Sequence, residues 1–169
     1  MDFLLVVLRL IHIVSAFAWV GLAVTMTFYV APAAAAAGES GLRFLKALLT
    51  RTSFATAVGA AAGITTLAGI LLYLVGNATA HFSSTGNTVL GIGALSGILA
   101  TIHGGAVTGR ATREFGEALV KHVPDNGQPI PADALPVLRE HGMKVGAHSR
   151  LSLILVAIAL LGMGSARYL

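Results

Sequence analysis

Four long apolar blocks, separated by shorter polar segments, form the main pattern of this sequence. Each block has the length of a bilayer-crossing helix, because a hydrocarbon core of about 30 Å needs roughly 20 helical residues. In lipid, backbone polar groups must pair within their own segment, which favours helices, and the alternating strands of a barrel are not visible. The pattern predicts spans at about residues 3–30, 54–76, 88–109 and 145–166.

The composition agrees with this pattern. Of 169 residues, 56% are hydrophobic and only 11% are charged, whereas soluble domains carry about 25% charged residues. We therefore expect an all-α fold, an integral membrane four-helix bundle that forms one domain over residues 1–169, in contact with a lipid bilayer. The first block is not expected to be a cleaved signal peptide, because it follows Asp2 and is about twice the usual length.

The basic residues indicate an orientation. With four spans, both termini share one side with the 77–87 connection, and the segments around 31–53 and 110–144 share the other. Nine of the eleven Lys and Arg residues fall on that second side, if Arg150 near the start of the fourth span is counted, and the positive-inside rule assigns this side to the cytoplasm. We expect an N-out/C-out protein of the cell inner (plasma) membrane, with 110–144 as a cytoplasmic connection. Since the positive charge is confined to these loops, a nucleic-acid partner is not expected.

The connections carry further expectations. The first helix should end near Pro32, and an amphipathic segment with leucines at helical spacing should lie at the lipid headgroups, at Leu42, Leu45, Leu48 and Leu49. The third helix should run past Arg110 to Lys121 before Pro and Gly residues break it. A short helix capped by Asp133 should then end at Gly142.

Small residues recur at four-residue spacing in the second and third spans. Gly59 and Gly63 mark the second span, as do Thr65 and Gly69, and Gly93 and Gly97 mark the third. Such spacing lets helices approach closely in lipid. It predicts that these two helices pack tightly together, which would leave cofactor space beside the first and fourth helices.

Histidines are the main candidates for chemistry, because ionisable side chains inside a membrane are costly and tend to be functional. Helical rise places His12 about 7 Å outside the middle of its span and His103 about 7 Å inside, with His148 roughly 7 Å deeper still. His103 and His148 are thus expected to share one inner site. His12 would form an outer site with His81 as its histidine partner, while two further histidines, His122 and His141, are expected to be solvated.

Imidazoles on facing helices could hold haem, copper or zinc. Haem is favoured because Gly104 and Gly105 would let a flat macrocycle approach the backbone, and Arg110 and Arg150 could pair with its propionates. Copper is disfavoured because the chain has no cysteine and its methionines are scattered, and zinc because the spans hold no carboxylate. The alternative is that the histidines only bond to neighbouring hydroxyls, such as Ser152.

A family resemblance rests on the first span. The sequence from Arg9 through His12 to Trp19 and Gly21 resembles the first helix of the copper-resistance protein D-like membrane family. It also resembles the four-helix bacterial protoporphyrinogen oxidase family, which shares the four-span layout. The resemblance to the oxidase family implies haem ligation by His12. That family also has a lysine in its third helix, where this sequence has none and Arg110 is the nearest cation.

These patterns lead to three functional hypotheses. The leading one is a b-type haem-binding membrane protein that passes electrons, with quinone or quinol as a candidate partner, or that serves as a subunit of a membrane redox complex. The second is a non-catalytic accessory subunit of a larger complex, and the third is copper or small-solute transport. No catalytic set is visible, since every carboxylate lies in a loop or near a terminus; whether the protein is an enzyme, and whether it forms a homo-oligomer, stays open.

Overall fold

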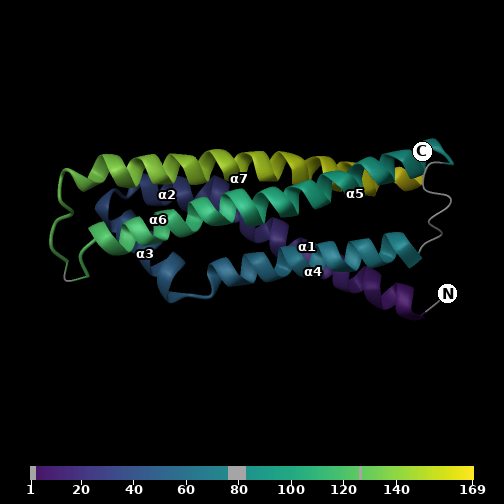
Figure 1. The fold of residues 1–169 in the computed structure, drawn as a ribbon, viewed down its shortest axis with the longest axis horizontal. Coiled ribbons are helices and arrows are strands. Elements are labelled where there is room, and N and C mark those ends of the chain that lie inside the picture. Colours follow the sequence, from purple (N-terminus) through teal and green to yellow (C-terminus); the bar gives the residue numbers. More distant parts are fainter. Residues whose placement is uncertain (1–2, 76–82, 126) are drawn as a thin grey trace.

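The computed structural model of the protein describes residues 3–75, 83–125 and 127–169. Over these ranges the chain is helical and contains no strand, and four helices are long and apolar enough to cross a bilayer. The all-α class and the four candidate spans are therefore confirmed (Figure 1). In chain order the elements are α1 (Phe3–Thr25), the π-helical turn η1 (Met26–Val30), α2 (Ala31–Ala36), α3 (Glu39–Arg51), α4 (Phe54–Val75), α5 (Thr85–His103), the π-helical turn η3 (Gly104–Thr108), α6 (Gly109–His122), α7 (Ala134–Ser165) and the 3-10 turn η4 (Ala166–Tyr168).

Three of the four long helices exceed the thickness of a bilayer. Elements join end to end into continuous runs of 34 residues (Phe3–Ala36), 38 residues (Thr85–His122) and 35 residues (Ala134–Tyr168). At 1.5 Å per residue the longest run spans about 57 Å, against a hydrocarbon core of about 30 Å. The additional turns extend toward the end of the bundle that also holds α3 (Figure 1).

The prediction that the first helix ends near Pro32 is wrong. The π-helical turn η1 comes directly before α2, whose first turn contains Pro32, and the run continues to Ala36. Proline normally breaks a helix because it lacks an N–H and its ring clashes with the carbonyl four residues earlier. The wider η1 turn and the position of Pro32 in the first turn of α2 relieve both problems, so the helix continues.

The long connection agrees with its prediction at one end only. The third run reaches His122, close to the predicted Lys121, and the chain is extended at Val123. Beyond it, Gly142 does not end a short helix, because α7 runs without interruption from Ala134 to Ser165. A glycine inside a helix costs only about 1 kcal/mol, and here the backbone is held against α6, with the Phe115 ring 3.7 Å from where a Gly142 side chain would begin. Asp133 occupies the N-cap position but its side chain makes no capping bond.

The helices form two close pairs, α1 with α4 and α5 with α7 (Figure 1). The prediction that the second and third spans pack tightly on each other is therefore wrong. A methyl group on Gly59 or Gly63 would meet nothing within 4 Å, whereas one on Gly93 would lie 3.0 Å from the backbone nitrogen of Met163 in α7. Small-residue spacing reveals that a helix can approach another closely, but it does not say which helix is the partner.

A cluster of buried side chains joins α2, α3, α6 and the start of α7, and we call this region the cap. Its residues are Ala34, Leu45, Phe115, Ala118, Leu119, Val123, Ile130, Ala134 and Leu138. The apolar face of α3 is used here: Leu45 is buried in the cluster, and Leu42, Leu48 and Leu49 pack against it. The leucines of this segment thus pack on protein, and its location at the lipid headgroups stays a prediction.

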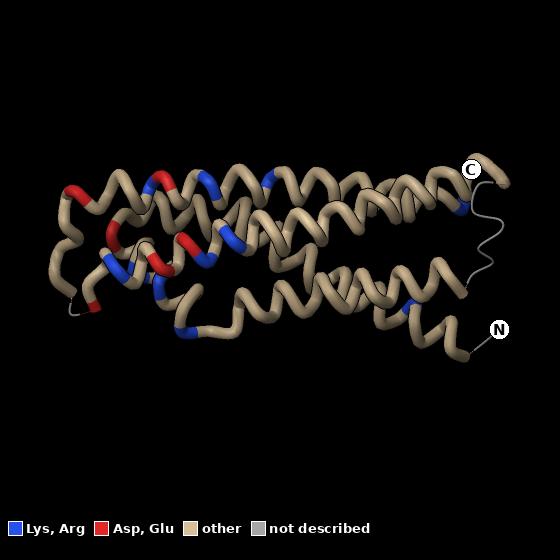
Figure 2. Tube along the Cα trace, viewed as in Figure 1, with Lys and Arg blue, Asp and Glu red and all other residues tan. Residues whose placement is uncertain are grey.

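Charged residues gather at the cap end of the bundle (Figure 2). Three cations of α3 hold the segment that links α6 to α7. The ammonium of Lys46 is buried and donates to the Val123 carbonyl at 2.6 Å while it pairs with Asp125 at 2.8 Å. Arg51 also pairs with Asp125, at 2.7 Å, and Arg43 donates to the Pro124 carbonyl at 2.6 Å. The two connections expected on the cytoplasmic side are therefore fastened to each other.

Candidate functional site

His12 is held in the interface between α1 and α4. Its Nδ1–H donates to the Thr65 carbonyl at 2.8 Å, because a carbonyl oxygen can only accept. In the neutral ring the lone pair is then on Nε2, the nitrogen available to a metal. A methyl group on Gly69 would lie 2.8 Å from His12 Cε1, so the absence of a side chain there makes room for the ring. Gly69 is thus part of the packing surface that accommodates the His12 ring.

Two hydroxyl groups complete this interface. The Thr65 hydroxyl donates to the carbonyl of Ala61 at 2.7 Å and lies 2.9 Å from the hydroxyl of Ser15. The Ser15 hydroxyl in turn donates to the Ile11 carbonyl at 2.6 Å. His81, the predicted partner of His12, lies outside the residues that the structure describes.

The predicted difference in depth between His12 and His103 is not observed. Thr66 of α4 and Thr101 of α5 share a hydrogen bond of 2.6 Å, which places them on one level. His12 lies against Thr65 and Gly69, and His103 follows Thr101 by two residues. At 1.5 Å per residue, the two histidines are separated along the bundle by about one helical turn rather than by about 14 Å. The estimate placed the middles of the apolar blocks at one level, and the contacts of His12 and Thr101 with α4 show that they are not.

His103 and His148 are brought together, as predicted. Their ring centroids lie 5.6 Å apart with the planes tilted by 58°. His103 comes from the last residue of α5 and His148 from the facing helix α7. His103 Nδ1 lies 2.9 Å from the hydroxyl of Ser152, and that hydroxyl is also 3.1 Å from the hydroxyl of Thr108. Over the described part of the chain, His148 makes this ring contact and has no hydrogen-bond partner.

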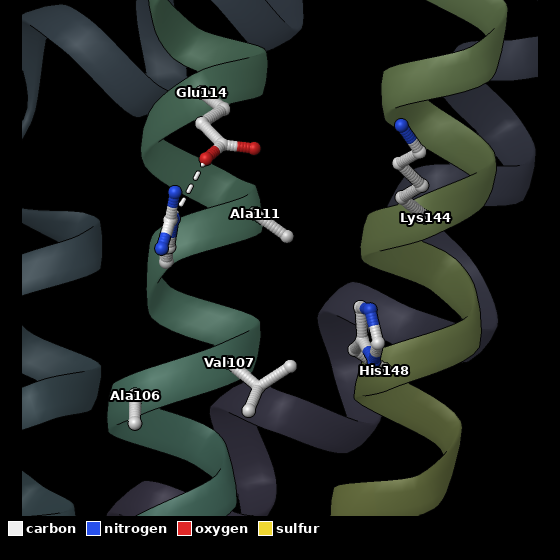
Figure 3. Close-up of a pocket in the computed structure, with 7 residues that line it drawn as sticks. Ala106, Val107, Ala111, Glu114, Lys144 and His148 are labelled. Atoms are coloured by element: carbon white, nitrogen blue, oxygen red, sulfur yellow. Dashed lines mark hydrogen bonds and ion pairs between the residues drawn. The ribbon is translucent and has the colours of Figure 1, made fainter.

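An open groove of about 260 Å³ lies beside His148, between η3 and α6 on one side and α7 on the other (Figure 3). Small apolar side chains, Ala106, Val107 and Ala111, line one wall. The other wall carries His148 and, one turn from it along α7, Lys144 (Figure 3). The groove therefore combines an imidazole, an apolar surface and charges of both signs, since Glu114 also lines it.

The cations at this groove differ in part from those predicted. Arg110 lines it and pairs with Glu114 of its own helix at 2.9 Å. Arg150 is exposed and is not among the lining residues, because two residues along a helix rotate it by about 200° from His148. Lys144, which the sequence reasoning missed, takes that place, and it pairs with Glu140 at 2.7 Å. Its spacing of four residues before His148 is the signal that could have identified it.

The π-helical turn η3 also escaped prediction. It begins directly after His103 and is closed by the Gly109 N–H donating to the Gly104 carbonyl, a bond that spans five residues instead of four. Turns of this kind occur often at functional sites. Gly104 and Gly105 were interpreted as a flat surface for a macrocycle; the structure shows that they open the wide turn.

The described residues contain no group of three or more His, Cys, Asp or Glu side chains that could hold a metal ion by themselves. Comparisons of the chain with models of known protein families, with curated proteins and with solved structures find no match. The resemblance carried by His12, Trp19 and Gly21 therefore stays a prediction. In the structure Trp19 is buried beside Ala100 and Val156, where it bridges the two helix pairs.

Proposed function

We propose that the protein binds a b-type haem at the groove beside His148, with His103 and His148 as its ligands, and passes electrons within the membrane. The observation that carries this proposal is the pair of imidazoles from facing helices, of which His148 lines a groove whose other lining side chains are three small apolar residues, two cations and Glu114. Quinone or quinol is the candidate electron partner, and a larger membrane redox complex is the alternative setting for the same chemistry.

The donor set suits haem better than a bare metal ion. A zinc or copper site made only of protein needs three or four ligands, whereas a porphyrin supplies four nitrogens and leaves one or two positions to the protein. His103 and His148 come from facing helices, and the 5.6 Å between their ring centroids would let both reach the iron of one bound haem.

Ser152 holds His103, while no hydrogen bond holds His148 within the described residues, so His148 is the ring with more freedom to adjust to a ligand. At the rim, Arg110 and Lys144 each pair with a glutamate four residues away on an exposed helix surface. Such surface pairs contribute only about 0–1 kcal/mol, so the two cations are available to carboxylates of a ligand. The alanine and valine side chains opposite His148 give one face of the groove an apolar surface.

Bound haem would supply one-electron oxidation and reduction, which none of the protein's own side chains provides. His12 is a second candidate ligand, since its free nitrogen is Nε2 and its ring orientation is fixed by Thr65. Its level in the bundle, about one turn from His103, no longer requires a separate outer site. Whether it holds a second haem is decided by the number of haems bound per chain.

Absorption spectra of the purified protein, after haem supplementation and in the oxidised and dithionite-reduced states, test the proposal. We expect a Soret band and sharp reduced bands in the wild type. His103→Ala and His148→Ala should each lose or strongly alter them, whereas His122→Ala and His141→Ala serve as matched controls and should not. A chain without Soret absorbance, or one whose spectrum survives both groove substitutions, overturns the assignment of this site.

One observation favours a second function, that of a non-catalytic accessory subunit. His12 and His103 both hydrogen-bond to protein, as they would if they only fastened helices to each other. This alternative expects no haem and a stable complex with another membrane protein. Spectra of the isolated chain without a Soret band, together with a stoichiometric partner retained in native purification, would support it.

A further inference from the structure

We infer that Ser152 and Thr108 are positioning residues for His103: they hold its Nδ1 so that Nε2 is presented to a ligand in the groove region. The inference rests on the proposed function, because it takes His103 as a ligand. The inference goes beyond the proposed function by assigning a role to two hydroxyl groups and to the π-helical turn that separates His103 from Thr108.

The first observation is that the Ser152 hydroxyl is not bonded to its own helix. Serine and threonine in helices commonly donate to the carbonyl four residues earlier. Ser152 differs, because its described partners are His103 Nδ1 and the Thr108 hydroxyl, both on the facing run. The usual pattern is seen in this protein at Ser15, Thr50, Thr52, Thr65, Thr101, Thr112 and Ser165.

The second observation is the geometry of η3. Five residues of a regular α-helix turn through about 500°, which would leave Thr108 about 140° around the helix from His103. A turn closed by bonds over five residues contains about one residue more, so residues five apart come to lie on nearly the same face. This is how Thr108, the last residue of η3, reaches the same Ser152 hydroxyl as His103.

The hydrogen-bond directions then follow from counting protons. With Nε2 bound to a metal, Nδ1 of His103 carries the proton and donates it to the Ser152 oxygen, and the Ser152 hydroxyl donates onward to Thr108. Without a ligand, the reverse direction also satisfies all three groups: Thr108 donates to Ser152, which donates to a bare Nδ1. The two hydroxyl groups thus accept either tautomer, and ligand binding selects the one with Nε2 free.

Partners of this kind commonly change metal affinity by about 10–100-fold when they are removed. We therefore expect Ser152→Ala to weaken haem binding by about 10–100-fold and to raise the midpoint potential, because an imidazole without an Nδ1 acceptor donates less charge to the iron. Ser152→Thr keeps the hydroxyl and should restore both values. Thr108→Val should act in the same direction as Ser152→Ala but more weakly.

Thr112→Val is the matched control. It makes the same chemical change one helical turn further along, where the hydroxyl donates to the Thr108 carbonyl at 2.9 Å and contacts neither His103 nor Ser152. Thermal unfolding of each variant shows whether a lost affinity reflects a lost fold. If Ser152→Ala and Thr108→Val bind haem with wild-type affinity and potential, the positioning role is wrong while the proposed function stands.

A second readout does not need haem. In protein labelled with ¹⁵N-histidine and prepared without haem, the His103 ring nitrogens are identified by their loss in His103→Ala. We expect Ser152→Ala to change the ¹⁵N shift of Nδ1 and the tautomer balance, and Thr112→Val to leave both unchanged. Unchanged His103 signals in Ser152→Ala would overturn the inference, whatever the wild-type spectrum says about haem.

Discussion

Gly69 offers a sharp test of how α1 packs on α4. An added methyl group would lie 2.8 Å from Cε1 and 3.0 Å from Nδ1 of His12, which is closer than real carbon contacts allow. The atoms that must give way are at the end of a side chain, so the ring of His12 is expected to move. Since Nδ1 is the atom that bonds to the Thr65 carbonyl at 2.8 Å, a movement of several tenths of an ångström also weakens that bond.

The magnitude of Gly69→Ala follows from three contributions. Overpacking costs about 1–3 kcal/mol, and the weakened hydrogen bond adds up to about 1 kcal/mol. Replacing glycine by alanine inside a helix returns about 1 kcal/mol. The net expectation is a loss of about 0–3 kcal/mol in the free energy of unfolding.

Gly63→Ala provides the control for helix propensity, because it lies on the same helix and its added methyl group would meet nothing within 4 Å. Thermal or denaturant unfolding in detergent micelles compares the two variants. We expect Gly63→Ala to match or slightly exceed the wild type. In a His12→Ala background the clash disappears, so Gly69→Ala should become harmless there. Equal stability of Gly69→Ala and Gly63→Ala in the presence of His12 would refute the described packing.

Three further predictions concern packing and charge. Gly162→Ala should lower the free energy of unfolding by about 1–3 kcal/mol, because its methyl group would lie 3.0 Å from the α5 backbone. Gly164→Ala, whose methyl group would face open space, should not lower it, and thermal unfolding compares the two variants. Lys46→Ala removes a buried ammonium with two partners and should speed hydrogen exchange in 123–130 strongly, whereas Arg51→Ala, an exposed ion pair worth about 0–1 kcal/mol, should change it little. The hydrogen bond from Lys46 holds the pKa of Asp125 below its ordinary value of 3.8, so its stabilising effect is complete above that value and is lost as pH falls through the lower folded-state pKa. The difference in melting temperature between wild type and Asp125→Asn should therefore shrink in acid and stay constant above about pH 5.

The sequence was most informative about the membrane-spanning pattern. Runs of apolar residues determine which segments become helices in lipid, because each segment must satisfy its own backbone. The ends of these helices were harder to predict, as Pro32 and Gly142 show. Both residues disfavour a helix locally, but η1 accommodates the proline and packing on α6 outweighs the glycine. Local preferences of this kind are overridden when contacts with neighbouring elements stabilise the helix by more than about 1–3 kcal/mol.

The candidate site, too, could be predicted from the sequence only in part. His103 and His148 could be paired from sequence, because both were expected on the inner side of the membrane, on different helices and within reach of one site. Their surroundings could not: the Ser152 hydroxyl was noticed only as a neighbour of His148 on α7, whereas it bonds across to His103. Lys144, and not the predicted Arg150, lines the groove, because the direction of a side chain around a helix matters as much as its distance along it.

The position of the groove follows from how α5 and α7 separate. At the far end of the pair their backbones touch, since Gly93 and Gly162 leave no side chain between them. Toward the cap, Ser96 donates to the Leu155 carbonyl at 2.8 Å, and His103 then reaches Ser152. Side chains between the helices thus grow from none to a hydroxymethyl group to an imidazole, and the space beside His148 opens where the largest has been reached.

Beyond the groove the helices are held again by the cap. Phe115 and Leu138 are buried there, on α6 and α7, and Lys46 fastens the connection between these two helices. The histidine pair therefore lies between two regions of close packing, the Gly93–Gly162 contact and the cap. These contacts hold the helices together on both sides of the pair. A ligand site needs its side chains held to within about 0.5 Å, and helices fixed on both sides of the site provide this. The separation of 5.6 Å between the rings is then a property of the scaffold.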